Sequence, residues 1–288
     1  MTMSVPAWFA PYYHDQIIHR LQNSGFKLKN TVVGPSDVKG SGCYWRIAAS
    51  VIASLYKRGD RAAPAGGVRT TINANFETWQ VYEEVFDDDL EKLPMAEMEV
   101  VIKSGSMALG RRFDQQIMTA LAADAPTSGA GYVTDTTAGM TLSNAVLLCE
   151  QAQVLGGAEW ADGEWYCALP PRLWNQLMVY KQFSSSDYVG ADLPFAQRAY
   201  MRSWNGVNWF MAPVDWFPIP AASQVDVFLW RKDCVGYGTN YDLKNSIAWE
   251  QPITAFTSNM RMAGISKVLL TEGVIRGRFK SDAALAPN

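Results

Sequence analysis

The sequence predicts an α+β fold with one very long helix, a protruding β-hairpin and an N-terminal arm. The helix follows from an apolar stripe that repeats every three or four positions within residues 94–123. The hairpin follows from two runs rich in β-branched and aromatic residues, 43–58 and 68–83, which flank the turn-forming segment GDRAAPAGG. Because a lone two-stranded hairpin is at best marginally stable in water, this one must lie on its own core or on another chain.

The composition indicates a folded protein that neither crosses a membrane nor clamps nucleic acid by charge. The 288 residues are 48% apolar and 18% charged, which rules out disorder for most of the chain. The apolar runs are shorter than the roughly 18 residues that span a bilayer. The net charge of −3 disfavours a protein that grips nucleic acid through its phosphates. The four cysteines lack zinc spacing and are predicted to be reduced and mostly buried: Cys43, Cys149, Cys167 and Cys234.

Residues 1–30 are predicted to form an arm with a short helix, followed by a Gly- and Pro-rich connector over residues 31–42. Pro94 suits the first turn of the long helix, and the acidic residues before it complement the helix dipole. At 1.5 Å per residue this helix would be about 45 Å long. Its buried stripe is predicted to comprise Met98, Ile102, Gly105, Leu109, Phe113, Ile117 and Leu121.

After the long helix the pattern predicts a mixture of shorter helices and strands. Residues 124–140 read as loop with one strand, and helices are predicted to begin at Thr141 or Ser143 and at Pro170-Pro171. Strands are predicted at 164–169, within 195–217, and at 225–230, 247–249 and 253–262. Residues 268–279 are predicted to close the fold as a hairpin that turns near Glu272-Gly273.

The charge is distributed unevenly along the chain. Residues 1–70 carry nine Lys/Arg and three Asp/Glu, whereas residues 71–100 carry one Lys and nine Asp/Glu. The net charges of these adjacent segments are therefore +6 and −8. This asymmetry is either simple surface patterning or self-complementarity, with one segment of a subunit docking on the other segment of a neighbour.

No constellation of residues predicts catalysis, a metal or a cofactor. Both histidines, His14 and His19, lie in the arm, and neither a nucleophile elbow nor a Gly-rich phosphate loop is present. The run Asp87 to Asp89 is more typical of a helix cap than of a cation site. The 11 tryptophans leave one alternative from a different class, a carbohydrate-active or carbohydrate-binding domain. Its candidate residues are Asp162, Glu164, Trp160 and Trp165.

Several stretches resemble tailed-phage major capsid proteins of the Hong Kong 97 fold. The opening YYHDQIIHRLQNSGFKLKNTV, followed by KGSGCYWRIAAS, is similar to a subgroup whose members begin at the arm without a built-in scaffolding segment. The middle of the chain resembles the same subgroup in NFETWQVYEEVFDDDLEKL and ALGRRFDQQIMTALA. The later segments TLSNAVLLCEQAQVLGG, EWYCALPPRLWNQL, GVNWFMAPV and DVFLWRKDCVGYG follow the family's order, and ITAFTSNMRMAGISKVLLTEGVIRGRF resembles its closing strands.

The resemblance implies the domain organisation of that fold. Mapped onto this sequence, it gives an N-arm over 1–42, an E-loop hairpin over 43–84, a P-domain over 85–140 with its spine helix at 94–123, an A-domain over 141–250, and P-domain return strands with a C-terminal tail over 251–288.

The resemblance also implies a structural, non-enzymatic role. The chain would self-assemble into pentamers and hexamers of an icosahedral phage head that encloses double-stranded DNA without sequence-specific binding. Its location would be the virion, after assembly in the cytoplasm of the bacterial host. Separate scaffolding and portal proteins are implied partners, and a cement or decoration protein is left open. An encapsulin-type protein compartment that encloses a cargo enzyme is the alternative with the same fold.

Two hypotheses about individual residues follow. The first is that the basic E-loop docks on the acidic belt of an adjacent subunit, through Lys57, Arg58, Arg61 and Arg69 on one side and Asp87, Asp88, Asp89 and Glu91 on the other. The second concerns Gly105 and Gly110, which interrupt the spine helix at a cost of up to about 1 kcal/mol each relative to Ala. They either allow the helix to bend between an immature and an expanded shell or mark tight packing.

Overall fold

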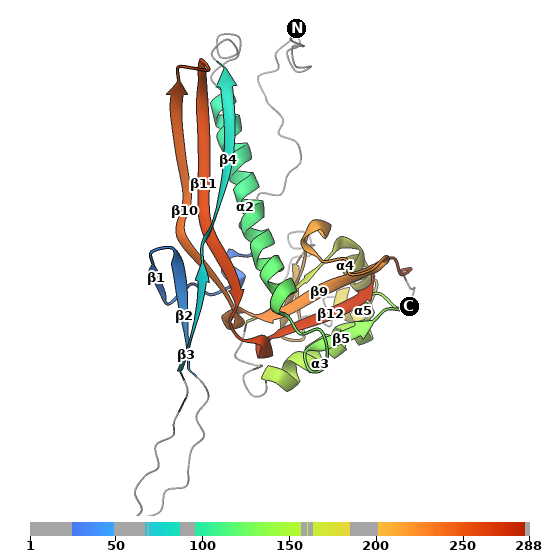
Figure 1. Ribbon diagram of the computed structural model, residues 1–288. Coiled ribbons are helices and arrows are strands. Elements are labelled where there is room, and N and C mark those ends of the chain that lie inside the picture. Colours follow the sequence, from blue (N-terminus) through green and yellow to red (C-terminus); the bar gives the residue numbers. More distant parts are fainter. Residues whose placement is uncertain are drawn as a thin grey trace, which may run out of the picture.

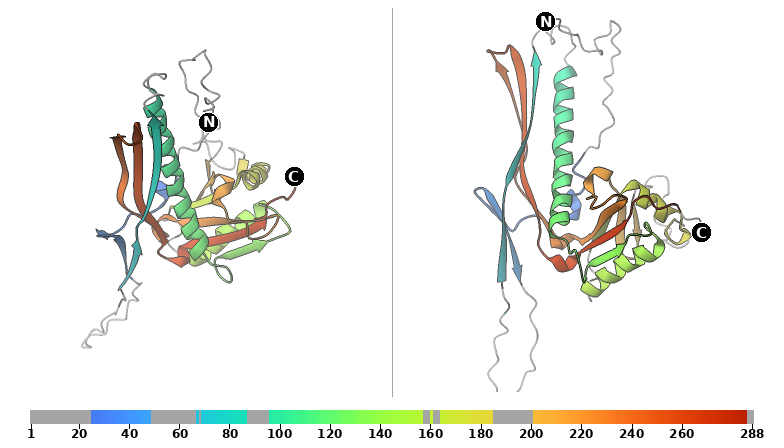
Figure 2. Two further views of the ribbon diagram at one scale, coloured as in Figure 1. Left: turned by 45° about the horizontal axis from the view of Figure 1, so that its top comes forward. Right: turned by 45° about the vertical axis from the view of Figure 1, so that its right-hand side comes forward.

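A computed structural model shows an elongated layer of one helix on a long sheet, joined to a compact lobe of mixed helices and strands (Figure 1). The residues that it describes are 25–48, 67, 69–86, 96–156, 160, 164–184 and 201–285. Two further views show that the lobe projects from one end of the layer, beside the C-terminal end of the long helix (Figure 2).

The predicted hairpin is present as far as its residues are described. Strands β2 (Gly42–Ala48) and β3 (Arg69–Asn75) are antiparallel, with Gly42 opposite Asn75 and Ala48 opposite Arg69. A third strand that the sequence did not predict, β1 (Asp37–Lys39), pairs with β2. It follows the short 3₁₀ helix η1 (Lys29–Thr31).

The elongated layer contains strands β4 (Glu77–Phe86), β10 (Val235–Glu250) and β11 (Ala255–Val268), in the antiparallel order β10-β11-β4. Helix α2 (Ala96–Asp124) packs on this sheet and confirms the predicted long helix. The predicted strand over residues 68–83 is in fact two strands, because β3 pairs with β2 while β4 pairs with β11.

The lobe is built on a six-stranded sheet with the order β5-β12-β9-β6-β8-β7. Its strands are β5 (Tyr132–Asp135), β6 (Trp165–Leu169), β7 (Met201–Trp204), β8 (Val207–Met211), β9 (Gln224–Arg231) and β12 (Val274–Lys280). Helices α3 (Leu142–Gly156), α4 (Pro171–Met178) and α5 (Lys181–Ser184) accompany it, as does the 3₁₀ helix η3 (Val214–Trp216). The sheet core includes the fully buried Trp165, Trp209 and Trp230.

The predicted closing hairpin over residues 268–279 is wrong. Strand β11 ends at Val268 in the elongated layer, whereas β12 lies in the lobe between β9 and β5. The alternating pattern predicted strands correctly, but it carries no information about the sheet that each strand joins. Strand β10 likewise begins at Val235, well before the predicted 247–249, and pairs with β11.

Two short 3₁₀ helices carry the chain between the layer and the lobe at one place. They are η4 (Lys232–Cys234), between β9 and β10, and η5 (Thr271–Gly273), between β11 and β12. The backbone N–H of Leu269 donates to the Cys234 carbonyl at 2.8 Å. A Cβ added at Gly273 would lie 2.1 Å from the Cys234 Sγ, so glycine is required for this close packing.

The prediction of reduced, mostly buried cysteines is confirmed, because all four are free and buried. Burial raises the pKa of Cys43 to about 11 and that of Cys149 to about 12. The pKa of Cys167 is also raised, mainly by burial and then by the neighbouring Cys149. These thiols stay protonated near neutral pH and therefore pack as small apolar side chains.

Candidate intersubunit surfaces

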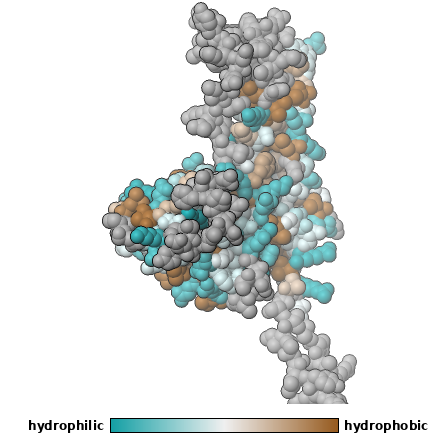
Figure 3. Space-filling view, turned by 180° about the vertical axis from the view of Figure 1, so that it is seen from behind, coloured by the Kyte–Doolittle hydropathy of each residue, from teal (hydrophilic) through white to brown (hydrophobic). Residues whose placement is uncertain are grey.

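The edge strand β10 exposes large apolar side chains along the elongated layer. Leu243, Ile247 and Trp249 are 40%, 47% and 43% exposed. The Trp249 ring packs edge-on against Phe256 of β11, with 4.8 Å between the ring centroids. Seen from behind, hydrophobic atoms are distributed along this layer (Figure 3). An exposed edge strand with apolar side chains is a surface on which another chain can pair or pack.

The strand register places part of this apolar surface on the same side of the sheet as helix α2. Trp249 lies opposite Phe256, and Phe256 lies opposite the buried Val85. Met260, four residues after Phe256 and thus on the same face, lies against Gly105 of α2. Helix α2 packs mainly on β11 and β4 (Figure 2). The strip of β10 beside the helix is therefore left uncovered within the described chain.

The opposite face of the sheet combines apolar and acidic groups near the end of β4. Tyr82 and Phe86 are 43% and 47% exposed. Partial desolvation, a hydrogen bond to Glu84 and the charges of Glu84 and Glu250 together raise the pKa of Tyr82. Acidic side chains thus already gather at the point where β4 approaches the predicted acidic belt.

The described ends of the basic and acidic segments, at Arg69 and Phe86, lie far apart in one subunit. Arg69 is exposed at the start of β3, and the chain then runs through β3 and β4 to Phe86 (Figure 1). At about 3.3 Å per residue, these ends are on the order of 50 Å apart. Lys57, Arg58, Arg61, Asp87, Asp88, Asp89 and Glu91 lie outside the described residues. Contact between Arg69 and the far end of β4 therefore requires two copies of the chain.

Gly105 and Gly110 both lie where another part of the chain approaches helix α2 closely. A Cβ added at Gly105 would lie 1.9 Å from the Cε atom of Met260, whose side chain is fully buried. At Gly110 the carbonyl accepts the N–H of Phe26 at 3.2 Å. A Cβ added at Gly25 would lie 2.4 Å from the Gly110 Cα. These contacts favour the tight-packing interpretation, and bending at these glycines stays a prediction.

Tight packing at Gly105 predicts that Gly105→Ala lowers the free energy of unfolding of the free subunit by about 1 kcal/mol. Overpacking against Met260 then outweighs the helix propensity that alanine gains. In a Met260→Ala background, where this contact is removed, the same Gly105→Ala change should cost less, and urea unfolding of the two single variants and the double variant measures this coupling. If bending is the main role, Gly105→Ala leaves this stability unchanged and impairs shell expansion instead.

The start of the described chain is fixed to helix α2 by a buried carboxylate. The two side-chain oxygens of Asp114 accept the backbone N–H groups of Lys27, at 3.2 Å, and Leu28, at 3.0 Å. Asp114 is fully buried, and this desolvation raises its pKa to about 6, although the two N–H bonds and the Lys27 charge oppose the shift. The sequence did not single out this residue.

Because Asp114 has a raised pKa in the folded state, its contribution to stability is present below pH 4 and is lost as the pH rises through about 6. This loss is on the order of 2–3 kcal/mol. We expect Asp114→Asn to flatten the pH dependence of urea unfolding over this interval. The exposed Asp215, replaced by Asn, serves as the control and should leave the slope unchanged. If the unfolding free energies of wild type and Asp114→Asn change equally with pH, Asp114 is not the group that titrates over this interval.

The residues suggested for a carbohydrate site do not form a tryptophan-lined cleft. Trp165 is fully buried, and Trp160 packs on it with 5.0 Å between ring centroids. Glu164 forms an ion pair of 2.7 Å with Lys232, and this bond together with one from Tyr166 lowers its pKa, opposite to the shift of a general acid. Asp162 lies outside the described residues. Trp165 therefore belongs to the core, and Trp160 packs against that core.

In the part of the chain that the structure describes, no group of three His, Cys, Asp or Glu side chains is placed to hold a metal ion. Over the same residues, no helix combines the length and the apolarity that crossing a bilayer needs.

Comparison with known proteins decides the identity of the family. The model of a family described as phage capsid protein matches residues 5–281. The chain belongs to this family. Its role is that of a structural capsid protein of a phage head, as the sequence predicted. No curated protein matches this capsid protein significantly in sequence.

Solved capsid structures share the fold of this capsid protein. The capsid of cyanophage P-SCSP1u aligns with a TM-score of 0.68 at 15% identity, covering 95% of this chain and 94% of that one. The capsid of Ralstonia phage GP4 aligns with a TM-score of 0.71 at 8% identity, covering 99% and 100%. The capsid of a native GTA particle aligns with a TM-score of 0.70 at 12% identity, covering 95% of each chain. At such identities the likeness is one of fold, and the predicted Hong Kong 97 type is confirmed.

Proposed function

We propose that this capsid protein assembles as pentamers and hexamers into an icosahedral head that encloses double-stranded DNA and performs no catalysis. The observation that carries the proposal is the elongated layer, whose edge strand leaves Leu243, Ile247 and Trp249 exposed in a single copy. A long sheet with an uncovered apolar strip is completed by a neighbouring subunit. Repeating one such interface around closed rings produces capsomers.

The charge distribution supports a specific arrangement of neighbours. The basic hairpin and the acidic end of β4 lie on the order of 50 Å apart in one chain. A ring in which each subunit places its hairpin near the next subunit's acidic belt brings the +6 and −8 segments together. Arg69 is the described basic member of this pairing, and the exposed Glu84 and Glu250 lie near the end of β4 that leads to the acidic belt. Complementary charges of this kind set register and suppress wrong contacts more than they add affinity.

The net charge also supports a container that holds DNA without clamping it. At −3 for the whole chain, sequence-independent phosphate binding is weak. Separate scaffolding and portal proteins would direct assembly in the bacterial cytoplasm, and a cement protein would be an addition to the shell. For the domains, we infer that the elongated layer is the P-domain and that the lobe is the A-domain. On that division β10, within the expected 141–250, joins the P-domain, while β12 joins the A-domain.

Negative-stain microscopy of the purified chain after size-exclusion chromatography tests this function. We expect shells or rings tens of nanometres across, or capsomer-sized oligomers. Particles that contain nucleic acid after nuclease treatment support a phage head, whereas particles filled with a cargo protein indicate an encapsulin-type compartment. A 32 kDa monomer that does not assemble even with its scaffolding partner would overturn the proposal.

A further inference from the structure

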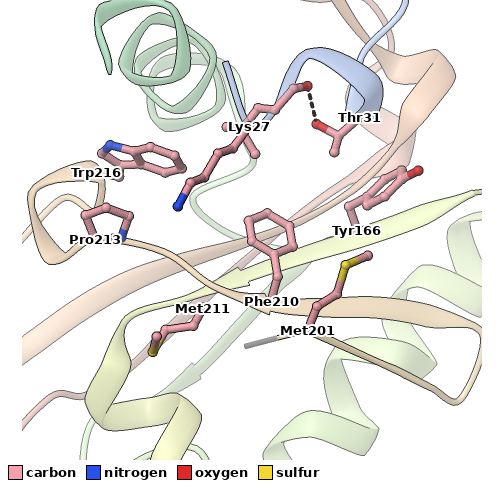
Figure 4. A pocket seen from close by; sticks show the side chains of 9 residues that line it. Lys27, Thr31, Tyr166, Met201, Phe210, Met211, Pro213 and Trp216 are labelled. Atoms are coloured by element: carbon pink, nitrogen blue, oxygen red, sulfur yellow. Dashed lines mark hydrogen bonds between the residues drawn. The ribbon is translucent and has the colours of Figure 1, made fainter. Parts of the chain in front are cut away.

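A cavity of about 310 Å³ lies between the start of the described chain and one face of the lobe sheet (Figure 4). One wall comes from the N-terminal segment, through Lys27 and Leu28. The remaining lining is mostly apolar and aromatic, with two flexible methionines, and includes Tyr166, Met201, Phe210, Met211, Pro213 and Trp216. A preformed apolar pocket with a few polar groups at its edge is typical of a binding site.

The pocket has a rigid floor and an apolar rim. The Phe210 ring stands edge-on to Trp230 at 6.0 Å between centroids, and the Trp230 indole donates to the Thr31 carbonyl at 3.1 Å. Met211, which lines the pocket, is 40% exposed, and Val214, next to the lining residue Pro213, is 51% exposed. Exposed apolar side chains around an apolar pocket favour an apolar occupant. Methionine adapts to occupants of different shape.

The position of the pocket relative to the N-terminal segment identifies an occupant. Residues 1–24 end three positions before Lys27, which lines the pocket and is fixed by the buried Asp114. This segment carries apolar side chains that need burial, namely Val5, Trp8, Phe9, Tyr12, Tyr13, Ile17, Ile18 and Leu21. From Gly25 back to Ile18 the extended chain spans up to about 24 Å, which is ample to reach a pocket beside Lys27.

We propose that an apolar side chain from residues 1–24 of the same chain occupies this pocket in the unassembled subunit. A segment tethered this closely has an effective concentration on the order of millimolar, which favours it over the arm of another copy in dilute solution. The free subunit thus stores its own arm on its own lobe. This placement has a consequence for assembly, and only that consequence rests on the proposed function. While the arm occupies this pocket, it is not available to bind neighbouring subunits.

Disulfide trapping in the full-length protein tests the proposal. One cysteine is introduced at the rim as Met211→Cys, and a second in the arm as Phe9→Cys, Tyr13→Cys or Ile18→Cys. The native cysteines are buried and do not compete. The matched control places the rim cysteine at Val154→Cys, which is 69% exposed on α3. Helix α3 packs on the other face of the sheet. Gly156, at the end of α3, faces Trp165. Trp165 and the pocket residue Tyr166 are neighbours in β6, and successive side chains of a strand point to opposite faces.

We expect at least one arm position to form an intrachain disulfide with Met211→Cys roughly tenfold faster than with Val154→Cys. Mass spectrometry after digestion identifies the bond, and gel mobility without reductant separates intrachain from interchain products. Equal rates at both sites for all three arm positions would overturn the proposal. A predominantly interchain bond would also overturn it, because the occupant would then be the arm of another copy.

A second position, next to the lining residue Pro213, keeps the test decisive if Met211→Cys disturbs folding. Val214→Cys is 51% exposed and should trap the same arm position. Near-ultraviolet circular dichroism verifies that each variant keeps its packed aromatic core. Microscopy of the reduced variants reports on shell formation independently of the disulfide. Trapping without shells would contradict the proposed function alone, whereas shells without trapping would contradict the stored arm alone.

Discussion

Replacing Asp226 by Ala is expected to lower the free energy of unfolding by about 3–5 kcal/mol. Asp226 is 2% exposed in β9 and binds Arg278 of β12 with two bonds, of 2.7 and 3.0 Å. Its carboxylate also lies 3.8 Å from the guanidinium of Arg276, which is 6% exposed. Without the carboxylate a buried cation loses its counter-charge, which is among the costliest changes that a core can undergo.

The cluster also links the lobe to the long helix, because Arg276 donates to the carbonyl of Ala122 near the end of α2. Chemical unfolding followed by tryptophan fluorescence measures the effect. Asp233→Ala is the matched control, because its carboxylate pairs with Arg231 at 3.4 Å from an exposed position. We expect the control to lose less than about 1 kcal/mol. If Asp226→Ala and Asp233→Ala lower the free energy of unfolding by similar amounts, burial is not the reason that Asp226 matters.

Reversing the charge of the hairpin is expected to abolish normal shell assembly. The double change Arg58→Glu, Arg61→Glu places negative charge opposite the acidic belt of the neighbour in the proposed arrangement, and juxtaposed like charges cost several kcal/mol per interface. Each subunit repeats the interface, so the effect multiplies through a ring. Particle yield by sedimentation and microscopy measures the result. Normal particles from this double variant would contradict the charge pairing.

The compensating change provides the control for this experiment. Asp88→Lys, Asp89→Lys alone should fail to assemble for the same reason. Combining the four substitutions restores opposite charges and the original net charge of −3, so assembly should partly return. Added salt should improve assembly of each double variant, because screening weakens the repulsion. Failure of the fourfold variant at every salt concentration would indicate that these side chains act through shape rather than charge.

The local elements could be predicted from the sequence because their patterns are long and periodic. The stripe that includes Leu109, Phe113 and Ile117 placed α2 within two residues of each observed end, and these three side chains are buried as expected. The pairing of β2 with β3 followed from two β-rich runs around a Gly-rich turn. Local pattern and tertiary packing agree in these segments.

The partnerships between distant segments could not be predicted in the same way. A period of two identifies a strand but not its sheet, which is why the segment containing Val274 was assigned to the wrong pairing. Asp114 and Asp226 were missed because each forms its bonds across a long stretch of sequence. Asp226 carried one local signal, since it interrupts the apolar run QVDVFLW, where a carboxylate needs a buried partner.

The place where η4 and η5 connect the layer to the lobe determines how a mechanical force passes through this subunit. Both strands that enter the layer there, β10 and β11, are paired with each other along most of their length. A pull between the tip of the layer and this crossing therefore runs along both strand backbones at once and does not peel the ladder open. The close packing of Gly273 on Cys234 leaves little room for the two connections to move independently at this crossing. A shell built from such subunits would resist internal pressure because the force acts along paired backbones rather than on single strand pairs.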